Sequence, residues 1–222
     1  MWFSSPVYRL LFHTLGNILP QKYGLNLRLE PIIWSRGLDL VKAGLADGII
    51  DASYQDKRAK HAGYPMIQGK LDTTKILRRS RYLLYINKES TIQWDGTTFS
   101  NIDGPIASIK SYAIVQDLKE IGVNVLEMQR ELAIIKDVYI GKLAAAALPE
   151  TITGTAFKQL PYLKENIKIH TPPLSTKDYY LIFSKHFYKQ NTEYAEEIWS
   201  AYKHYRLSRE YKALEAELGN GK

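Results

Sequence analysis

WSRGLDLVKAGLADGIIDASYQDKRAKHAGYP, residues 34–65, predicts a helix that leads directly into a buried strand. Ser35 is a common N-cap residue type, and Gly44 can take the left-handed conformation that ends a helix after Lys42. Residues 47–52, DGIIDA, are a short apolar run with the length of a buried strand. This step from helix to strand is typical of α/β proteins with a largely parallel sheet.

The residues before this stretch predict one more helix and one more strand. Ser5 and Pro6 suit an N-cap and a first helical position, and apolar residues follow at helical spacing up to Pro20, where we expect the helix to stop. Residues 25–29 alternate leucine with polar side chains, which is the period of a strand. A lobe of this kind usually starts with a strand, and none precedes Ser5. We therefore expect the first strand to be missing and the lobe to depend on residues upstream of this chain.

The rest of the chain repeats the α/β pattern after a long strand at residues 76–87 and a polar, turn-rich stretch. Further strands are expected at residues 105–109, 123–126, 143–148, 167–170 and 179–183, and helices at 112–121, 130–140 and 151–157, with two final helices that separate near residues 207 and 208. The repeat predicts an α/β fold in which a second unit is inserted into the first. Lobe 1 would comprise residues 1–87 and 175–222, and lobe 2 residues 88–174.

The composition is that of an ordinary globular chain with an excess of positive charge. The 222 residues are 45% hydrophobic and carry a formal net charge of +7. A basic chain can bind nucleic acid, but the positive residues are dispersed, and only Arg78, Arg79 and Arg81 form a short cluster. We therefore expect no nucleic-acid partner. No apolar run reaches the roughly 18 residues that span a membrane, and residues 1–20 lack the basic start and cleavage site of a signal peptide.

No catalytic or metal-binding motif stands out. Cysteine is absent, which excludes disulfides and cysteine-ligated metals. The five histidines show no metal-ligand spacing, and the chain has no G-x-S-x-G elbow, no G-x-G-x-x-G motif and no phosphate-binding glycine loop. We therefore expect no cofactor, no metal and no enzymatic activity.

Residues 34–65 resemble the signature region of bacterial extracellular (periplasmic) solute-binding proteins of the amino-acid-binding type. The resemblance rests on an aromatic residue, a helix end G-x-x-D, a motif S-x-x-x-x-R and an apolar Y-P, which are here Trp34, Gly44, Asp47, Ser53, Arg58, Tyr64 and Pro65. It implies the type II periplasmic-binding-protein fold, whose two lobes close on a ligand by hinge motion.

The resemblance also implies a function. The protein would bind a small polar solute, an amino acid or a related carboxylate, between its lobes and deliver it to the permease of an ABC-type membrane transporter. It would act as a monomer in the periplasm or outside the cell, with its signal peptide removed or lying upstream of this chain. The main alternative is a ligand-sensing module of a signalling or regulatory protein with the same fold. A third possibility is a family member that has lost its ligand.

Arg58 and Ser53 are the first candidate ligand-binding residues. A guanidinium is a planar, bidentate partner for a carboxylate, and Arg58 lies just beyond a predicted buried strand, where open α/β sheets place their ligands. The resemblance implies that both positions contact the ligand. The alternative is that Arg58 is a solvated charge in the run Asp56-Lys57-Arg58. Tyr54, beside Ser53, is a further candidate for the wall of the site.

The loop after the strand at residues 105–109 is the candidate site in lobe 2. It offers Ser108 and Ser111, and the resemblance implies that its backbone amides and a hydroxyl contact the ligand, although Ser111 also suits an ordinary helix cap. The family pairs a ligand α-amino group with an acidic residue after a later strand. The closest match here is Glu150, whose offset argues against an α-amino-acid ligand. Trp2 is the candidate aromatic residue that stacks on the ligand, because it lies nearest to the expected first strand-to-helix loop.

Overall fold

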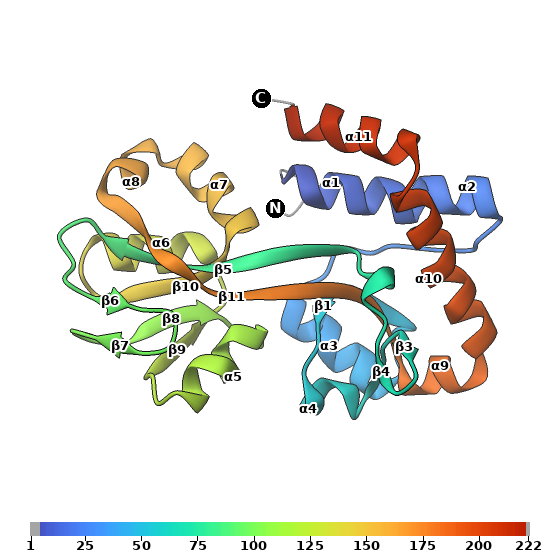
Figure 1. Ribbon diagram of the computed structural model, residues 1–222, viewed down its shortest axis with the longest axis horizontal. Helices are drawn as coiled ribbons and strands as arrows, with labels where there is room; N and C mark the ends of the chain where they lie inside the picture. The colour runs from blue at the N-terminus through green and yellow to red at the C-terminus, as the bar shows by residue number, and fades with distance from the viewer. Residues whose placement is uncertain (1–4, 221–222) are drawn as a thin grey trace. The chain divides into compact units, whose positions relative to one another are not determined.

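The computed structural model describes residues 5–220, without the side chains of residues 152–155 and 219–220. The chain divides into two compact units: unit 1 comprises Met1–Arg79 and Asp178–Lys222, and unit 2 comprises Ser80–Lys177. Two long strands, β5 (Arg78–Asn87) and β11 (Ile167–Ser184), contain residues of both units (Figure 1). The hydrogen-bonding order of the main sheet is β1-β11-β5-β10-β8-β9, with β2 paired to β11. The fold is therefore mixed α/β, as predicted.

Unit 1 is mainly helical. Besides its parts of β5 and β11 it has the strands β1 (Gly48–Ser53) and β2 (Ala62–Gly63) and a small hairpin of β3 (Met66–Ile67) and β4 (Lys70–Leu71). Its helical segments are α1 (Pro6–His13), η2 (Thr14–Ile18), α2 (Leu19–Tyr23), α3 (Trp34–Ala43), α4 (Asp56–Ala59), η3 (Thr73–Lys75), α9 (Lys185–Gln190), α10 (Thr192–Arg206) and α11 (Arg209–Asn220).

The largest core of unit 1 joins the two ends of the chain. Figure 1 shows α1 and α11 side by side, and α10 packs against α2. The fully buried side chains of this core include Leu15, Leu19, Trp199, Tyr202 and Tyr205. Burying a large apolar side chain contributes about 1.5–3 kcal/mol, so these helices stabilise one another rather than forming alone.

The N-terminal helix continues past Pro20, which corrects the prediction that it stops there. α1 passes through the π-helical turn η2 into α2, and Pro20 lies in the first turn of α2. A proline has no N–H to donate and clashes with the carbonyl of a regular preceding turn, and the wider π turn accommodates both effects. The helix ends instead at Gly24, which is left-handed with φ 67°.

Residues 25–29 do not form a strand, although their side chains alternate in burial as predicted. Leu25 is buried, and Leu27 and Leu29 pack against the same helical core. Among residues 5–220, no strand pairs with this segment. A strand needs a neighbour that satisfies its backbone N–H and C=O groups, so the alternation determines which leucines are buried without producing a ladder.

The stretch at residues 34–65 forms the predicted helix and strand. α3 ends at Gly44, which is left-handed with φ 72° and donates its N–H to the carbonyls of Leu40 and Val41, and β1 follows four residues later. The helix starts earlier than predicted, because Ile33 and not Ser35 is its N-cap. Trp34, the first residue of α3, is partly buried and packs against the core that the helix covers.

Unit 2 contains the predicted second α/β pattern. β8 (Ile106–Ile109) pairs in parallel with β9 (Val125–Met128) and with β10 (Ala145–Pro149), and β10 pairs antiparallel with β5. Its helices are α5 (Ala113–Glu120), α6 (Glu131–Tyr139), α7 (Glu150–Gln159) and α8 (Pro161–Asn166), and a hairpin joins β6 (Gln93–Trp94) to β7 (Phe99–Ser100). Its core contains the fully buried Ile134, Ile135 and Val138 of α6, packed with residues of β5, β8 and β10.

β11 is one continuous strand from Ile167 to Ser184, which corrects the prediction of two separate strands at residues 167–170 and 179–183 on either side of Pro172 and Pro173. Thr171 and Pro172 are exposed. Proline is tolerated in a strand at positions where no neighbour needs its missing N–H, so the two prolines do not end this one.

Candidate functional site

Arg58 is the centre of a cluster at the carboxyl end of β1. Its Nη1 donates to the carbonyl oxygen of Ser53, the last residue of β1, and the Tyr64 hydroxyl donates to the same oxygen at 2.9 Å. The Arg58 guanidinium carbon lies 5.5 Å from the ring centroid of Trp34. Tyr54 and Tyr64 contact each other edge to face, with ring centroids 5.1 Å apart. These five residues are termed the Arg58 cluster.

The Arg58 cluster combines one positive charge, that of Arg58, with neutral aromatic side chains. Burial raises the pKa of Tyr64 to about 12, although the nearby Arg58 opposes this rise. The pKa of Tyr54 is also raised, mainly because its hydroxyl donates to the Asp56 carboxylate at 2.9 Å. Both phenols therefore stay protonated at neutral pH. Arg58 is half-buried, whereas Asp56 and Lys57 beside it are exposed, so it differs from its neighbours in the charged run.

A second cluster surrounds a buried ion pair that the sequence did not indicate. The register of β1 against β11 shifts between Ile49 and Ala52, and Asp51 within this bulge has φ 68°. The bulge turns the Asp51 carboxylate onto Arg78, whose Nε and Nη2 each donate to it at 2.7 Å. The Tyr8 hydroxyl of α1 donates to the same carboxylate at 2.8 Å.

The surroundings of this pair are apolar and aromatic. The side chains of Arg78 and Asp51 are only 10% and 8% exposed, and the Arg78 guanidinium lies 4.2 Å from the ring centroid of Tyr179. Burial by itself would lower the pKa of Arg78, but the Asp51 carboxylate raises it above the usual arginine value. The contacts of this pair therefore join four elements of unit 1. Tyr8 belongs to α1, Asp51 to β1, Arg78 to β5 and Tyr179 to β11.

All three arginines of the short basic cluster form ion pairs. Besides Arg78 with Asp51, Arg79 donates two hydrogen bonds to Asp178, and Arg81 pairs with Glu150. The sequence shows three neighbouring positive charges, whereas the fold brings a carboxylate to each. This segment is therefore neutralised within the chain.

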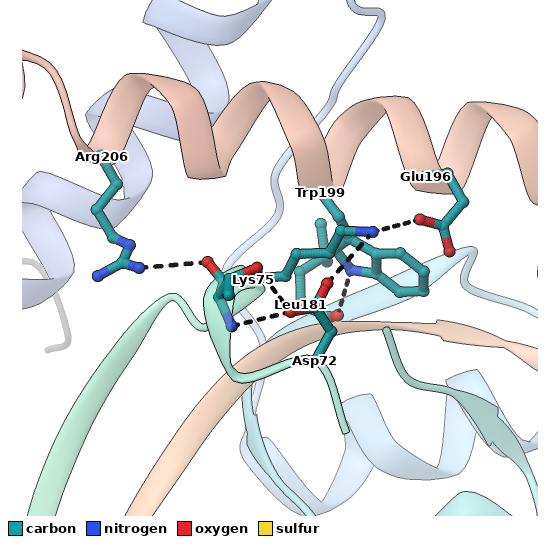
Figure 2. Close-up of polar contacts among 7 residues, drawn as sticks. Asp72, Lys75, Leu181, Glu196, Trp199 and Arg206 are labelled. Atoms are coloured by element: carbon teal, nitrogen blue, oxygen red, sulfur yellow. Dashed lines mark hydrogen bonds and ion pairs between the residues drawn. The ribbon is translucent and has the colours of Figure 1, made fainter. Parts of the chain in front are cut away.

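A polar network fixes the turn that precedes β5. Figure 2 shows Lys75 of η3 reaching Glu196 on α10, while Asp72 accepts hydrogen bonds from the backbone N–H of Thr74 at 3.0 Å and from its hydroxyl at 2.6 Å. The Lys75 Nζ lies over the ring of Trp199 of α10, 5.8 Å from the ring centroid. The indole N–H of Trp199 donates to the carbonyl of Leu181 on β11 at 2.8 Å. The network holds η3, just before β5, against α10.

The candidate residues of unit 2 lie at the end of β8. Ser108 is fully buried, and its hydroxyl donates to the carbonyl of Ala147 on β10 at 2.7 Å. Ser111 has φ 66°, and its backbone N–H donates to Glu127 at 3.2 Å. Glu127 also accepts from Lys119 at 2.8 Å, and this contact is the main reason that its pKa is lowered. Ser111 is not the cap of α5, because the N-cap residue is Tyr112.

Two further sequence-based expectations concern the ligand. Glu150 follows β10 as predicted, but one of its oxygens accepts from the Arg81 backbone N–H at 3.0 Å and the other from Arg81 Nε at 2.8 Å. The Arg81 guanidinium thus neutralises Glu150, the carboxylate that the sequence suggested as the partner of a ligand α-amino group. Trp2 lies outside the described residues.

Among the residues described, no three His, Asp or Glu side chains come together as a metal would need. No described helix has the length and apolar character needed to cross a membrane.

Comparisons with known proteins find structural relatives. The sequence matches no protein-family model, and it matches no curated protein. A histidine kinase sensor domain with similarity to periplasmic binding proteins superposes with a TM-score of 0.75 at 13% identity, covering 93% of this chain and 84% of that one. The substrate-binding protein of an amino acid ABC transporter gives 0.69 at 16% identity, covering 92% and 84%.

A third relative is the arginine-, lysine-, histidine-binding protein ArtJ from Geobacillus stearothermophilus. It gives a TM-score of 0.71 at 15% identity, covering 94% of this chain and 84% of its own. At these identities the likeness concerns the fold, and the same fold is shared by these two binding proteins and the sensor domain. The chain therefore has the two-lobed fold of the type II periplasmic binding proteins.

Proposed function

We propose that this protein binds a small polar solute, an amino acid or a related carboxylate, and delivers it to the permease of an ABC-type membrane transporter. The observation that carries this proposal is the Arg58 cluster, which holds a guanidinium at the carboxyl end of β1. Solved proteins of the same fold include the substrate-binding protein of an amino acid ABC transporter and the arginine-, lysine-, histidine-binding protein ArtJ. The role is binding without catalysis, in the periplasm or outside the cell.

Arg58 is suited to hold an anionic group because its position is set before any ligand arrives. The Ser53 carbonyl and the Trp34 ring restrain a side chain that otherwise loses considerable rotamer freedom on binding. The planar guanidinium has five N–H donors, so one arginine can bond a backbone carbonyl and a ligand carboxylate together. Tyr54 and Tyr64 pack edge to face in the same region, and their hydroxyls donate to Asp56 and to the Ser53 carbonyl.

The Arg81–Glu150 pair bears on the kind of ligand. An α-amino group needs a carboxylate partner, and Glu150 is already neutralised by Arg81. Small carboxylates without an α-amino group are therefore the first ligands to test, followed by amino acids and short peptides.

A thermal-shift screen of the purified protein against these three classes tests the proposal. A ligand present at 100 times its dissociation constant stabilises the folded state by about 2.7 kcal/mol, which is several degrees in melting temperature for a protein of this size. We expect at least one class to produce such a shift in the full chain. If no compound of any class shifts the melting temperature, the protein is not a binder of these solutes.

The second candidate function is ligand sensing in a signalling protein. The observation that favours it is the superposition with a histidine kinase sensor domain at a TM-score of 0.75. The neighbouring genes separate the two roles, because transporter genes beside this one favour delivery and a kinase or regulator gene favours sensing. A pull-down with the neighbouring gene product as bait would then show binding to the permease or to the regulator.

A further inference from the structure

Unit 1 also has a basic pocket that contains no residue of the Arg58 cluster, although the backbone N–H of its residue His61 donates to the carbonyl of Arg58 at 3.0 Å. Its volume is 260 Å³, and it lies where the end of α3, the turn between α4 and β2 and the start of α9 meet. Five of its eight lining residues are lysine or histidine and none is acidic; the five are Lys42, Lys60, His61, Lys185 and His186. We call this cavity, with these five side chains in its lining, the basic pocket.

The lysines of the basic pocket are not neutralised by the fold. Among the residues that the structure describes, Lys42, Lys60 and Lys185 take part in none of the ion pairs. Asp39 and Asp56 lie one helical turn before Lys42 and Lys60, yet neither is paired with them. This contrasts with the arginines at the start of β5, where each positive charge has its own carboxylate.

Backbone contacts hold the three segments of the pocket together. The backbone N–H of Lys185 donates to the carbonyl of His61 at 3.1 Å, and β2 pairs with the end of β11 next to it. Gly44 approaches the start of α9 so closely that a Cβ added to it would lie 3.3 Å from the His186 Cβ. The cationic side chains therefore extend from a fixed frame, although the chain positions that carry them are far apart in sequence.

Several cations around one concavity raise the local positive potential and favour a multiply charged anion. Lysine binds phosphate as a point charge, whereas a planar carboxylate is better matched by arginine, and the basic pocket contains no arginine. A phosphate monoester carries about −1.5 to −2 charges and three acceptor oxygens, whereas the phosphodiester of a lipid headgroup carries a single negative charge. We propose that the basic pocket binds a phosphate-bearing anion, either a free phosphate compound or the phosphate headgroup of an acidic lipid.

Neutralising the three lysines in this chain tests the proposal. We compare two triple variants. The pocket variant combines Lys42→Gln, Lys60→Gln and Lys185→Gln. The control variant combines Lys136→Gln, Lys142→Gln and Lys164→Gln, which removes the same charge from exposed, unpaired lysines of unit 2. All six side chains belong to exposed residues, so both variants should fold. Binding of tripolyphosphate is measured by calorimetry at low salt. Co-sedimentation is measured with phosphatidylglycerol vesicles and with phosphatidylcholine vesicles.

We expect the pocket variant to bind its probe at least about tenfold more weakly than the wild type, while the control variant stays within about twofold. Loss of tripolyphosphate binding identifies a free phosphate compound, and loss of binding to phosphatidylglycerol vesicles identifies a lipid headgroup. An equal loss in both variants would mean that net charge alone attracts the anions, and it would overturn the proposal. So would a wild type that binds neither probe.

Discussion

Replacing Asp51 by asparagine is expected to destabilise the folded state by about 3 kcal/mol, because it leaves the Arg78 charge buried without its carboxylate. Asparagine has nearly the same shape as aspartate and tolerates the left-handed conformation that Asp51 adopts at φ 68°. The loss therefore reports the missing charge and not backbone strain. The measurement is urea unfolding, with the midpoint and the slope compared between variant and wild type.

The chain supplies a matched control for this substitution. Arg79 and Asp178 form an ion pair with the same two-bond geometry, but the Arg79 side chain is 61% exposed, compared with 10% for Arg78. Asp178→Asn should cost less than about 1 kcal/mol, since exposed pairs contribute little. Adding Arg78→Met to Asp51→Asn should recover part of the loss by removing the buried charge. If Asp51→Asn costs no more than Asp178→Asn, burial of the pair does not have the effect assigned to it.

Replacing Trp199 by alanine is expected to cost about 3–5 kcal/mol of unfolding free energy, the range for a large aromatic side chain removed from a core. Trp199 is 1% exposed and packs against Phe183 and Tyr188, with ring centroids 5.2 and 5.6 Å away. Its removal also leaves the Leu181 carbonyl without the indole donor and the Lys75 ammonium without the ring beneath it (Figure 2). Urea unfolding measures the effect.

Two further variants show which part of Trp199 matters. Trp199→Phe keeps an aromatic ring but loses the N–H, so we expect a loss of about 1–3 kcal/mol from the unsatisfied carbonyl. Leu207→Ala, just beyond the end of α10 at 60% exposure, should change stability by less than about 0.5 kcal/mol. A loss for Trp199→Ala as small as that for Leu207→Ala would contradict the packing described for α10.

The sequence predicted those elements whose signals are local. Neighbouring residues in the sequence were enough to predict helix α3, its left-handed end at Gly44 and the strand β1. The second α/β pattern could be predicted for the same reason, because each of its helices has its own apolar period. Residues 25–29 show the limit of this reasoning: their alternation determines which leucines are buried, but a strand also needs a partner, and partners depend on the whole fold.

The Asp51–Arg78 pair could not be predicted from the sequence. Asp51 is part of a run that has the composition of a regular strand, and no residue type marks the bulge that turns its side chain toward Arg78. Arg78 itself belongs to a basic cluster whose carboxylate partners come from positions up to 99 residues away. Ser53 and Arg58, in contrast, are five residues apart in a short motif that marks both as ligand-binding candidates, and the structure adds a bond from the Arg58 guanidinium to the Ser53 backbone carbonyl.

The most direct test of ligand binding at Arg58 is a calorimetric titration with the best solute from the thermal-shift screen. Wild type, Arg58→Ala and Lys57→Ala are compared, because Lys57 is an exposed cation beside Arg58 and serves as its control. Arg58→Ala should cost about 1.5–3 kcal/mol, a loss of about 10- to 150-fold in affinity, as for a hydrogen bond to a charged group. Lys57→Ala should leave the affinity unchanged within about twofold. An Arg58→Ala variant that binds the solute as tightly as the wild type would contradict the assignment of this residue to the ligand.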